Sequence, residues 1–235
     1  MKHRLTIGTN LMICIMAAVL GVIFISLPAI TVGQTESSST ASEGKLIQLP
    51  APKLDGPVSL EKALATRRSI RRFSDRKFTM EQIGQLAWAG QGITEKTRGL
   101  RTAPSARASY PIKLYLATPS GLYLYLPEKH ALQVLGETDV RGQLSRQPAV
   151  ANAGCDIIIV SSVRNTSGQY GKRAEKWVLL EAGHIAQNIL LQAVSSGLGG
   201  VPIGGYDDPN AVGKMCKLSE NSEPVYLVAT GFPAE

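Results

Sequence analysis

The stretch from Lys176 to Tyr206 constrains the fold more than any other part of this 235-residue chain. Its apolar residues recur at offsets of three and four, which is the spacing of one face of an α-helix. They are Val178, Ala182, Ile185, Ile189 and Ala193, and the stripe is widened by Leu179, Leu190 and Val194. An apolar stripe of this width predicts a buried, central helix. Gly197 is expected to end it in the left-handed conformation.

A polar line runs along another face of the same helix. Glu181, His184 and Asn188 follow one another at offsets of three and four, and buried polar groups need hydrogen-bond partners. A lone histidine in a helix is more often structural than catalytic, so His184 stays open between a place in a substrate channel and a bond to Glu181 or to the backbone. The glycine pairs that follow, 199–200 and 204–205, leave the backbone free to approach a ligand.

The composition describes one globular domain. With 44% hydrophobic and 18% charged residues, the chain can bury a full core. The net charge of +7 is spread out, and its densest basic group lies at residues 67–77. No zinc finger, basic zipper or aromatic RNA-binding pattern accompanies that group, which argues against nucleic acid as a partner. The group is better explained as a local anion site.

The cysteines indicate neither a metal site nor a fixed disulfide. Cys14, Cys155 and Cys216 lack the spacing of metal ligands, so no metal is predicted. Two of them could pair outside the cytosol, and Cys155 with Cys216 is the pair inside the predicted domain. A disulfide also needs proximity, which the sequence leaves open.

The N-terminus has the pattern of a membrane-targeting segment. A short basic start precedes a run that is almost continuously apolar from Leu11 to Leu27. Residues 1–33 are therefore predicted to be a signal peptide or an uncleaved membrane anchor. The basic start favours a domain on the extracytoplasmic side. Residues 34–57, rich in Ser, Thr, Gly and Pro, are interpreted as a flexible linker, and residues 58–235 as the folded domain.

Within that domain the pattern predicts helices first and strands later. Ser59 and Thr79 are placed to cap two helices, the first ending at the basic group and the second at Gly90–Gly92. Residues 112–116 and 122–126 alternate like strands around a Pro-Ser-Gly turn, which predicts a hairpin. Residues 155–160 have the unbroken apolar run of a strand buried on both faces. A last strand is expected at residues 225–229.

The chemistry of these segments favours a cofactor over a nucleophile or a metal. Residues 67–73, Arg-Arg-Ser-Ile-Arg-Arg-Phe, combine fork-shaped cations with a hydroxyl group, a set that suits a phosphate. The competing interpretation is a solvated helix end whose arginines complement the helix dipole. Gly-x-Ser-x-Gly, His-Glu-x-x-His and phosphate-binding Walker sequences are absent from the sequence.

Taken in order, these pieces resemble the nitroreductase superfamily of FMN-dependent oxidoreductases, and most closely its SagB-type dehydrogenases. The resemblance covers about residues 59–233. It rests on segments 67–73, 104–111, 121–125, 170–173, 181–188 and 197–200 and on the closing Gly231-Phe232-Pro233.

The resemblance implies an α+β fold with a central, mainly antiparallel sheet flanked by helices, and FMN at a homodimer interface. Carried over to this sequence, the residues implied to hold the FMN phosphate and ribityl chain are Arg67, Arg68, Ser69 and Arg71. Those implied to line the flavin ring, from the partner subunit, are Pro104, Ser105 and Ala106. The backbone of Gly199, Gly200 and Val201 is implied to pass near the ring. The flavin does the chemistry, and the candidate catalytic residues are Tyr170 and His184.

Two departures from the family pattern bear on the activity. Azoline-oxidising SagB-type enzymes are associated with a Lys-Tyr pair, where this chain has Gln169-Tyr170. Arg107 and Ala108 occupy a loop position where glycine is common, which is expected to narrow the space over the flavin.

The resemblance therefore leads to an FMN-dependent oxidoreductase that passes hydride from NAD(P)H or another donor to a small conjugated acceptor such as a nitroaromatic or a quinone. The alternatives are a SagB-type dehydrogenase acting on a peptide azoline or another substrate, and a non-catalytic flavin-binding scaffold.

Overall fold

The computed structural model describes residues 44–162 and 173–235. Within these residues the chain forms a seven-stranded sheet in the order β1-β6-β5-β4-β7-β9-β8, in which each neighbouring pair is antiparallel. The strands are β1 (Leu46–Gln48), β4 (Ile112–Thr118), β5 (Gly121–Leu126), β6 (Ala131–Gly136), β7 (Cys155–Ser161), β8 (Gly199–Ile203) and β9 (Glu223–Gly231). Two short strands, β2 (Ile93–Glu95) and β3 (Leu100–Arg101), form a separate ribbon.

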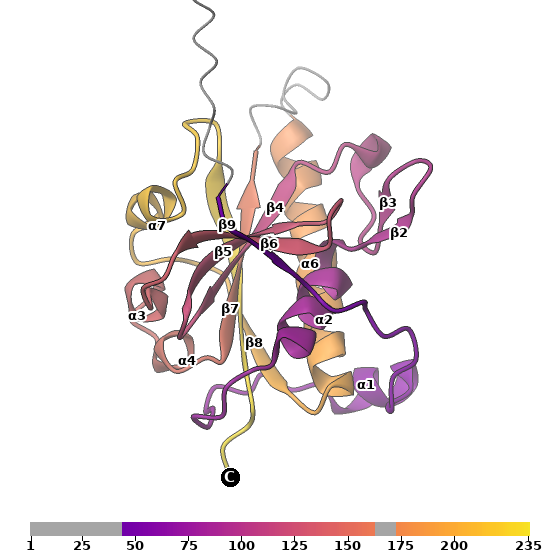
Figure 1. Cartoon of the computed structure of the whole chain (residues 1–235), viewed down its shortest axis with the longest axis vertical. Helices are drawn as coiled ribbons and strands as arrows, with labels where there is room; N and C mark the ends of the chain where they lie inside the picture. Colours follow the sequence, from indigo (N-terminus) through magenta and orange to yellow (C-terminus); the bar gives the residue numbers. More distant parts are fainter. Residues whose placement is uncertain (1–43, 163–172) are drawn as a thin grey trace, which may run out of the picture. The chain divides into compact units, whose positions relative to one another are not determined.

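Helices cover both faces of this sheet (Figure 1). One face carries α1 (Leu60–Thr66), α2 (Met80–Gln91) and the 22-residue α6 (Ala174–Ser195). The opposite face carries α3 (Arg141–Leu144), α4 (Pro148–Ala151) and α7 (Pro209–Met215). The predicted α+β class, with a mainly antiparallel sheet flanked by helices, is confirmed. Among the described residues, no helix is both long and apolar enough to cross a membrane.

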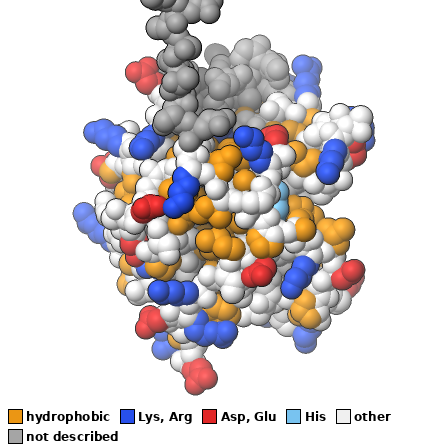
Figure 2. Space-filling model, in the orientation of Figure 1, with side chains coloured by type: hydrophobic (Ala, Val, Ile, Leu, Met, Phe, Trp, Pro, Cys, Tyr) orange, Lys and Arg blue, Asp and Glu red, His pale blue; other side chains and the backbone are white. Residues whose placement is uncertain are grey.

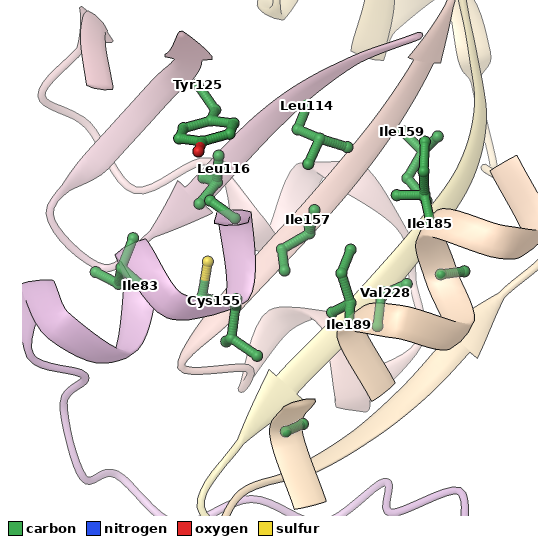
Figure 3. Close-up of a cluster of buried hydrophobic side chains, with 14 of the residues drawn as sticks. Ile83, Leu114, Leu116, Tyr125, Cys155, Ile157, Ile159, Ile185, Ile189 and Val228 are labelled. Carbon is green, nitrogen blue, oxygen red and sulfur yellow. The ribbon is translucent and has the colours of Figure 1, made fainter. Parts of the chain in front are cut away.

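The central strand β7 joins two hydrophobic cores. All seven of its residues are buried. Ile157 and Ile159 belong to the core beneath α2 and α6, whereas Ile158 and Val160 belong to the core beneath α3, α4 and α7. Figure 3 shows Ile185 and Ile189 of α6 on the first of these sides of the sheet. The unbroken apolar run therefore reflects a strand that is covered on both faces.

The predicted local signals are found where the sequence placed them. Ser59 Oγ accepts a hydrogen bond from Lys62 N at the start of α1. Thr79 and Gln82 form a complete capping box at the start of α2. Strands β4 and β5 form the predicted hairpin, and Gly197 has a φ of +69° after α6.

The outward face of α6 differs from the prediction. Val178, Ala182, Ile185, Ile189 and Ala193 are buried as expected, and Leu190 joins them. Leu179, however, is 51% exposed, and Trp177 and Leu180 are also exposed. The sheet covers only one side of a helix, so these three exposed side chains of α6 are not covered by the part of the chain that the structure describes.

The expected linker over residues 34–57 ends earlier than predicted. Leu46–Gln48 pairs with β6 as strand β1, and the following Leu49 is buried and donates its backbone N–H to His130 O (3.1 Å). The outer edge of β6 offers unpaired backbone groups, and β1 satisfies them. Residues 1–43, which include the predicted targeting segment, lie outside the described residues.

The two cysteines of the domain do not form a disulfide. Cys155 and Cys216 are free and buried. They belong to the two different cores, on opposite faces of the sheet.

Candidate functional site

The basic segment after α1 is held against the edge of the sheet by its backbone. Ser69 forms a parallel bridge with Gly200 of the edge strand β8, and Ile70 N donates to Gly200 O (3.1 Å). Four residues later Phe73 bridges Pro233, just after β9. The backbone therefore fixes the place of this segment and leaves its charged side chains free for other contacts.

Those side chains divide into two kinds. The Arg68 guanidinium donates through Nη1 to Ala65 O (3.1 Å) and Arg67 O (2.7 Å), so it caps the end of α1. This is the helix-end role that the sequence left as the competing interpretation. The side chains of Arg67 and Arg71 form no hydrogen bond or ion pair with any described residue. Figure 2 shows Lys and Arg side chains spread among hydrophobic ones over one face of the molecule.

The first glycine pair is required by the packing of the chain itself. A Cβ at Gly199 would lie 2.8 Å from Ile70 Cβ, and one at Gly200 would lie 2.9 Å from Leu190 Cδ2. Val201 is fully buried. At these positions the absence of side chains lets the basic segment and α6 approach β8 closely.

The second glycine pair has a different environment. Gly204 and Gly205 follow β8 directly, and both are exposed. A Cβ added at either position would meet no atom within 4 Å. Of the two pairs, this one leaves backbone accessible to a ligand.

The segment from Pro104 to Tyr110 is a loop with internal hydrogen bonds. Pro104 is exposed, while Ser105 and Ala106 are partly buried. Ser105 Oγ donates to Glu181 Oε2 of α6 (2.5 Å) and accepts from Tyr110 N (3.0 Å). The hydroxyl of Ser105 is therefore already used in fixing the loop.

Within one chain the basic segment around Ser69 and the loop of residues 104–110 lie at different levels along α6. The glycine beside Ser69 packs on Leu190, whereas Ser105 bonds to Glu181. Nine helical residues separate these contacts, which at 1.5 Å per residue is about 14 Å. The structure thus brings Ser69, Gly199 and Gly200 together but does not bring Pro104, Ser105 and Ala106 to them.

Glu181 is a buried carboxyl group with two donors. It is 3% exposed, and besides Ser105 it accepts a hydrogen bond from Gln91 Nε2 (3.4 Å). Burial raises the pKa of Glu181, while the hydrogen bonds from Ser105 and Gln91 and the charge of Arg101 act in the opposite direction. The sequence indicated a polar position here, but its partners are 76 and 90 residues away.

Of the two candidate catalytic residues, the structure describes His184 only. His184 is exposed on α6 and bonds to no described residue, so the considered hydrogen bond to Glu181 is not formed. Tyr170 lies outside the described residues. No group of three or more potential metal ligands occurs in residues 44–162 and 173–235.

A groove of the described chain lies away from all the predicted site residues. It has a volume of about 910 Å³ and runs between residues 51–58, α1, α2 and the second half of α6. Its walls include Leu54, Leu60, Trp88 and Leu191 together with polar groups such as Asn188.

Comparison with known proteins points to one family. The model of the Nitroreductase family matches residues 64–232. A protein of Methanocaldococcus jannaschii described as a candidate nitroreductase is 31% identical over 202 residues, which cover 82% of this chain and all of the relative.

Solved structures show the same fold. The crystal structure of a candidate nitroreductase from Ralstonia eutropha superposes with a TM-score of 0.76 at 30% identity, covering 83% of this chain and 92% of its own. The NADPH:FMN oxidoreductase of Vibrio harveyi, solved with NAD⁺, superposes with a TM-score of 0.56 at 23% identity, covering 75% of this chain and 69% of its own.

Proposed function

The chain belongs to the Nitroreductase family and is an oxidoreductase, and on that basis we propose that FMN is its cofactor. We further propose that it transfers hydride between NAD(P)H or another donor and a small conjugated acceptor, such as a nitroaromatic or a quinone. The observation that supports this most strongly is the pairing of Ser69 with Gly200, which holds Arg67 and Arg71, without partners among the described residues, beside the edge strand β8.

The residues at this edge fit the chemistry of FMN. Arg67 and Arg71 carry fork-shaped cations without partners among the described residues, and such groups suit a phosphate. From Gly200 the strand β8 leads to the exposed Gly204-Gly205, about 13 Å further at 3.3 Å per residue. FMN has its phosphate and its ring at opposite ends of a ribityl chain, so these two places suit its two ends.

The residues at this edge of the sheet then have separate roles in binding FMN. Arg67 and Arg71 neutralise the phosphate, and Ser69 offers a hydroxyl to the same end of the cofactor. The open backbone at Gly204 and Gly205 allows the ring to lie close to the protein. Bound FMN supplies the hydride chemistry, and the protein supplies binding, orientation and electrostatics.

We propose that the enzyme works as a homodimer. The family resemblance implies that Pro104, Ser105 and Ala106 reach the flavin ring from the second copy of the chain. Large apolar side chains that are exposed on α1 and α6 support this, because exposed apolar surface is a candidate for an interface. They are Leu60, Leu64, Trp177, Leu179 and Leu180. Light scattering should give twice the chain mass, and Leu180→Glu should shift the population to monomer.

The first test is the absorption spectrum of the full chain purified in detergent, with released FMN identified after denaturation. An oxidised flavin spectrum that bleaches with NADPH under argon supports the proposed reductase. Bound flavin that does not bleach points to another donor or to a substrate-oxidising dehydrogenase. A colourless dimer that takes up no added FMN would refute the catalytic proposal in favour of a scaffold.

We also propose that residues 1–33 place the domain on the extracytoplasmic side of a membrane. The proposal is supported by the basic start and the long apolar run that follows it. Protease added to intact spheroplasts should digest the domain. Digestion that requires lysis would contradict this orientation.

A further inference from the structure

The loop of residues 104–111 has an unusual backbone. Arg107, Ala108 and Tyr110 have φ angles of 54°, 53° and 45°. Residues with a Cβ are disfavoured in this left-handed region because the Cβ approaches the following carbonyl oxygen. Such a conformation persists only where the surrounding structure enforces it. The contacts that enforce it can be followed residue by residue.

Five residues form a closed circuit of hydrogen bonds around the base of the loop. Glu181 Oε2 accepts from Ser105 Oγ (2.5 Å), and Ser105 Oγ accepts from Tyr110 N (3.0 Å). Tyr110 Oη accepts from Arg101 N (3.0 Å), and Arg101 Nη1 donates to Gln91 Oε1 (2.7 Å). Gln91 Nε2 donates to Glu181 Oε1 (3.4 Å) and closes the circuit.

The circuit connects the loop to rigid elements. Gln91 is the last residue of α2, Arg101 lies in β3 and Glu181 lies in α6. Arg101 also lies over the Tyr110 ring, with 4.7 Å from its Cζ to the ring centre, and pairs with Glu128 (2.9 Å). Ser105 and Tyr110, at the two ends of the left-handed stretch, are both held in this way.

Glu181 has a special place among the five residues. It is the member that comes from the long central helix, and each of its two carboxylate oxygens takes one donor. Hydrogen bonds to a charged acceptor are stronger than those between neutral groups. Gln91 is 1% exposed and Glu181 is 3% exposed. Removal of the carboxylate would therefore leave Gln91 and Ser105 without their acceptor in a region that water hardly reaches.

We infer that Glu181 is a positioning residue that sets the conformation of loop 104–111 and, through it, the placement of Pro104, Ser105 and Ala106 against the cofactor. The part that concerns the cofactor rests on the proposed function. The anchoring of the loop does not, because every contact in the circuit lies within the chain.

The first experiment tests the anchoring without a flavin. Hydrogen exchange is measured on the full chain in detergent for wild type, Glu181→Gln, Glu181→Ala and the control Glu137→Gln. Glu137 is exposed and contacts Lys45 at 3.3 Å, far from the loop in sequence. We expect the Tyr110 amide, which donates to Ser105 Oγ, to exchange about tenfold faster in both Glu181 variants. The reason is that Ser105 loses its hydrogen bond to the charged carboxylate, and such a loss costs about that factor.

Glu181→Gln keeps the side-chain volume and one acceptor oxygen, so it remains informative if Glu181→Ala does not fold. Unchanged exchange of residues 105–110 in a folded Glu181→Gln variant would overturn the inference. Exchange that rises equally in Glu137→Gln would overturn it too.

The second experiment tests the link to the cofactor. We expect Glu181→Gln to weaken FMN binding about tenfold and to shift the long-wavelength band of the bound flavin. A residue that only stabilises the fold would leave that band in place. Ser105→Ala should have the same effect, and the double variant should lose little more, because both changes break one connection.

The two proposals fail in different ways. If the wild type binds no FMN, the proposed function is wrong, and the exchange experiment still decides whether Glu181 anchors the loop. If exchange rises while FMN affinity and the flavin band stay unchanged, the loop does not face the cofactor, and the inference is wrong while the proposed function stands.

Discussion

The segment after α1 and the loop of residues 104–111 are both expected to meet the cofactor, but they use their polar side chains differently. In the first, the backbone bonds to β8 and the side chains of Arg67 and Arg71 stay without partners among the described residues. In the second, the side chains of Ser105 and Tyr110 are bonded within the chain. The first segment therefore keeps its charges available for a ligand, whereas the second uses its polar groups to hold a strained backbone in place.

The largest effect should follow from removing an available arginine. Arg67→Ala should weaken FMN binding roughly tenfold to hundredfold, because a hydrogen-bonded charge pair with the phosphate would be lost. Its neighbour offers a matched control. Arg68→Ala should change FMN affinity by about twofold at most, since that guanidinium already caps α1. FMN titration by fluorescence measures the affinity of both variants. Equal losses of affinity would show that Arg67 and Arg68 contribute alike to FMN binding.

A smaller effect is expected on the free energy of unfolding, which should distinguish the two glycine pairs. Gly199→Ala should lower the free energy of unfolding by about 1–3 kcal/mol, because its Cβ would overlap Ile70. Gly204→Ala should change that free energy by less than about 0.5 kcal/mol, because the space around it is open. Urea unfolding of the two variants tests this. A Gly204→Ala variant as unstable as Gly199→Ala would mean that both pairs serve internal packing.

The smallest effect concerns the pH dependence of the stability that Glu181 gives to the loop of residues 104–111. Burial raises the pKa of Glu181 above its ordinary value of 4.5. A raised pKa means that the unfolded state loses its proton first, so the contribution of Glu181 to stability is complete below pH 4.5 and decreases as the pH rises through the folded-state pKa. Glu181→Gln should remove this decrease. Unfolding curves at several pH values measure it, and parallel pH profiles for the two proteins would contradict it.

The sequence allowed prediction of those elements whose signals are local. Such signals are the periodicity of α6, the capping residues Ser59 and Thr79, and the turn between β4 and β5. Each of them lies in the predicted element or within a few residues of it in the sequence. Strand β1 was missed because a three-residue strand has no period, and its partner β6 is more than 80 residues away. Strand β8 was hidden by its two glycines, which are rare in strands.

The site follows the same rule. The basic segment could be recognised from composition, because arginines and a serine stand together in the sequence. The glycine pairs could be located but not distinguished, since only packing shows that Gly199 faces Ile70 while Gly204 faces open space. The circuit of Glu181 was beyond sequence reasoning, because it joins residues from four separate elements and loops.

The separation of Cys155 and Cys216 by the sheet has a consequence for the conditions that the domain tolerates. Neither thiol can reach the other without unfolding, and burial raises the pKa of Cys216 to about 12 and that of Cys155 as well, so neither forms a reactive thiolate near neutral pH. The described domain therefore depends on no covalent cross-link between these residues. It should fold equally well in reducing and oxidising surroundings, so addition of a thiol reductant should leave its melting temperature unchanged.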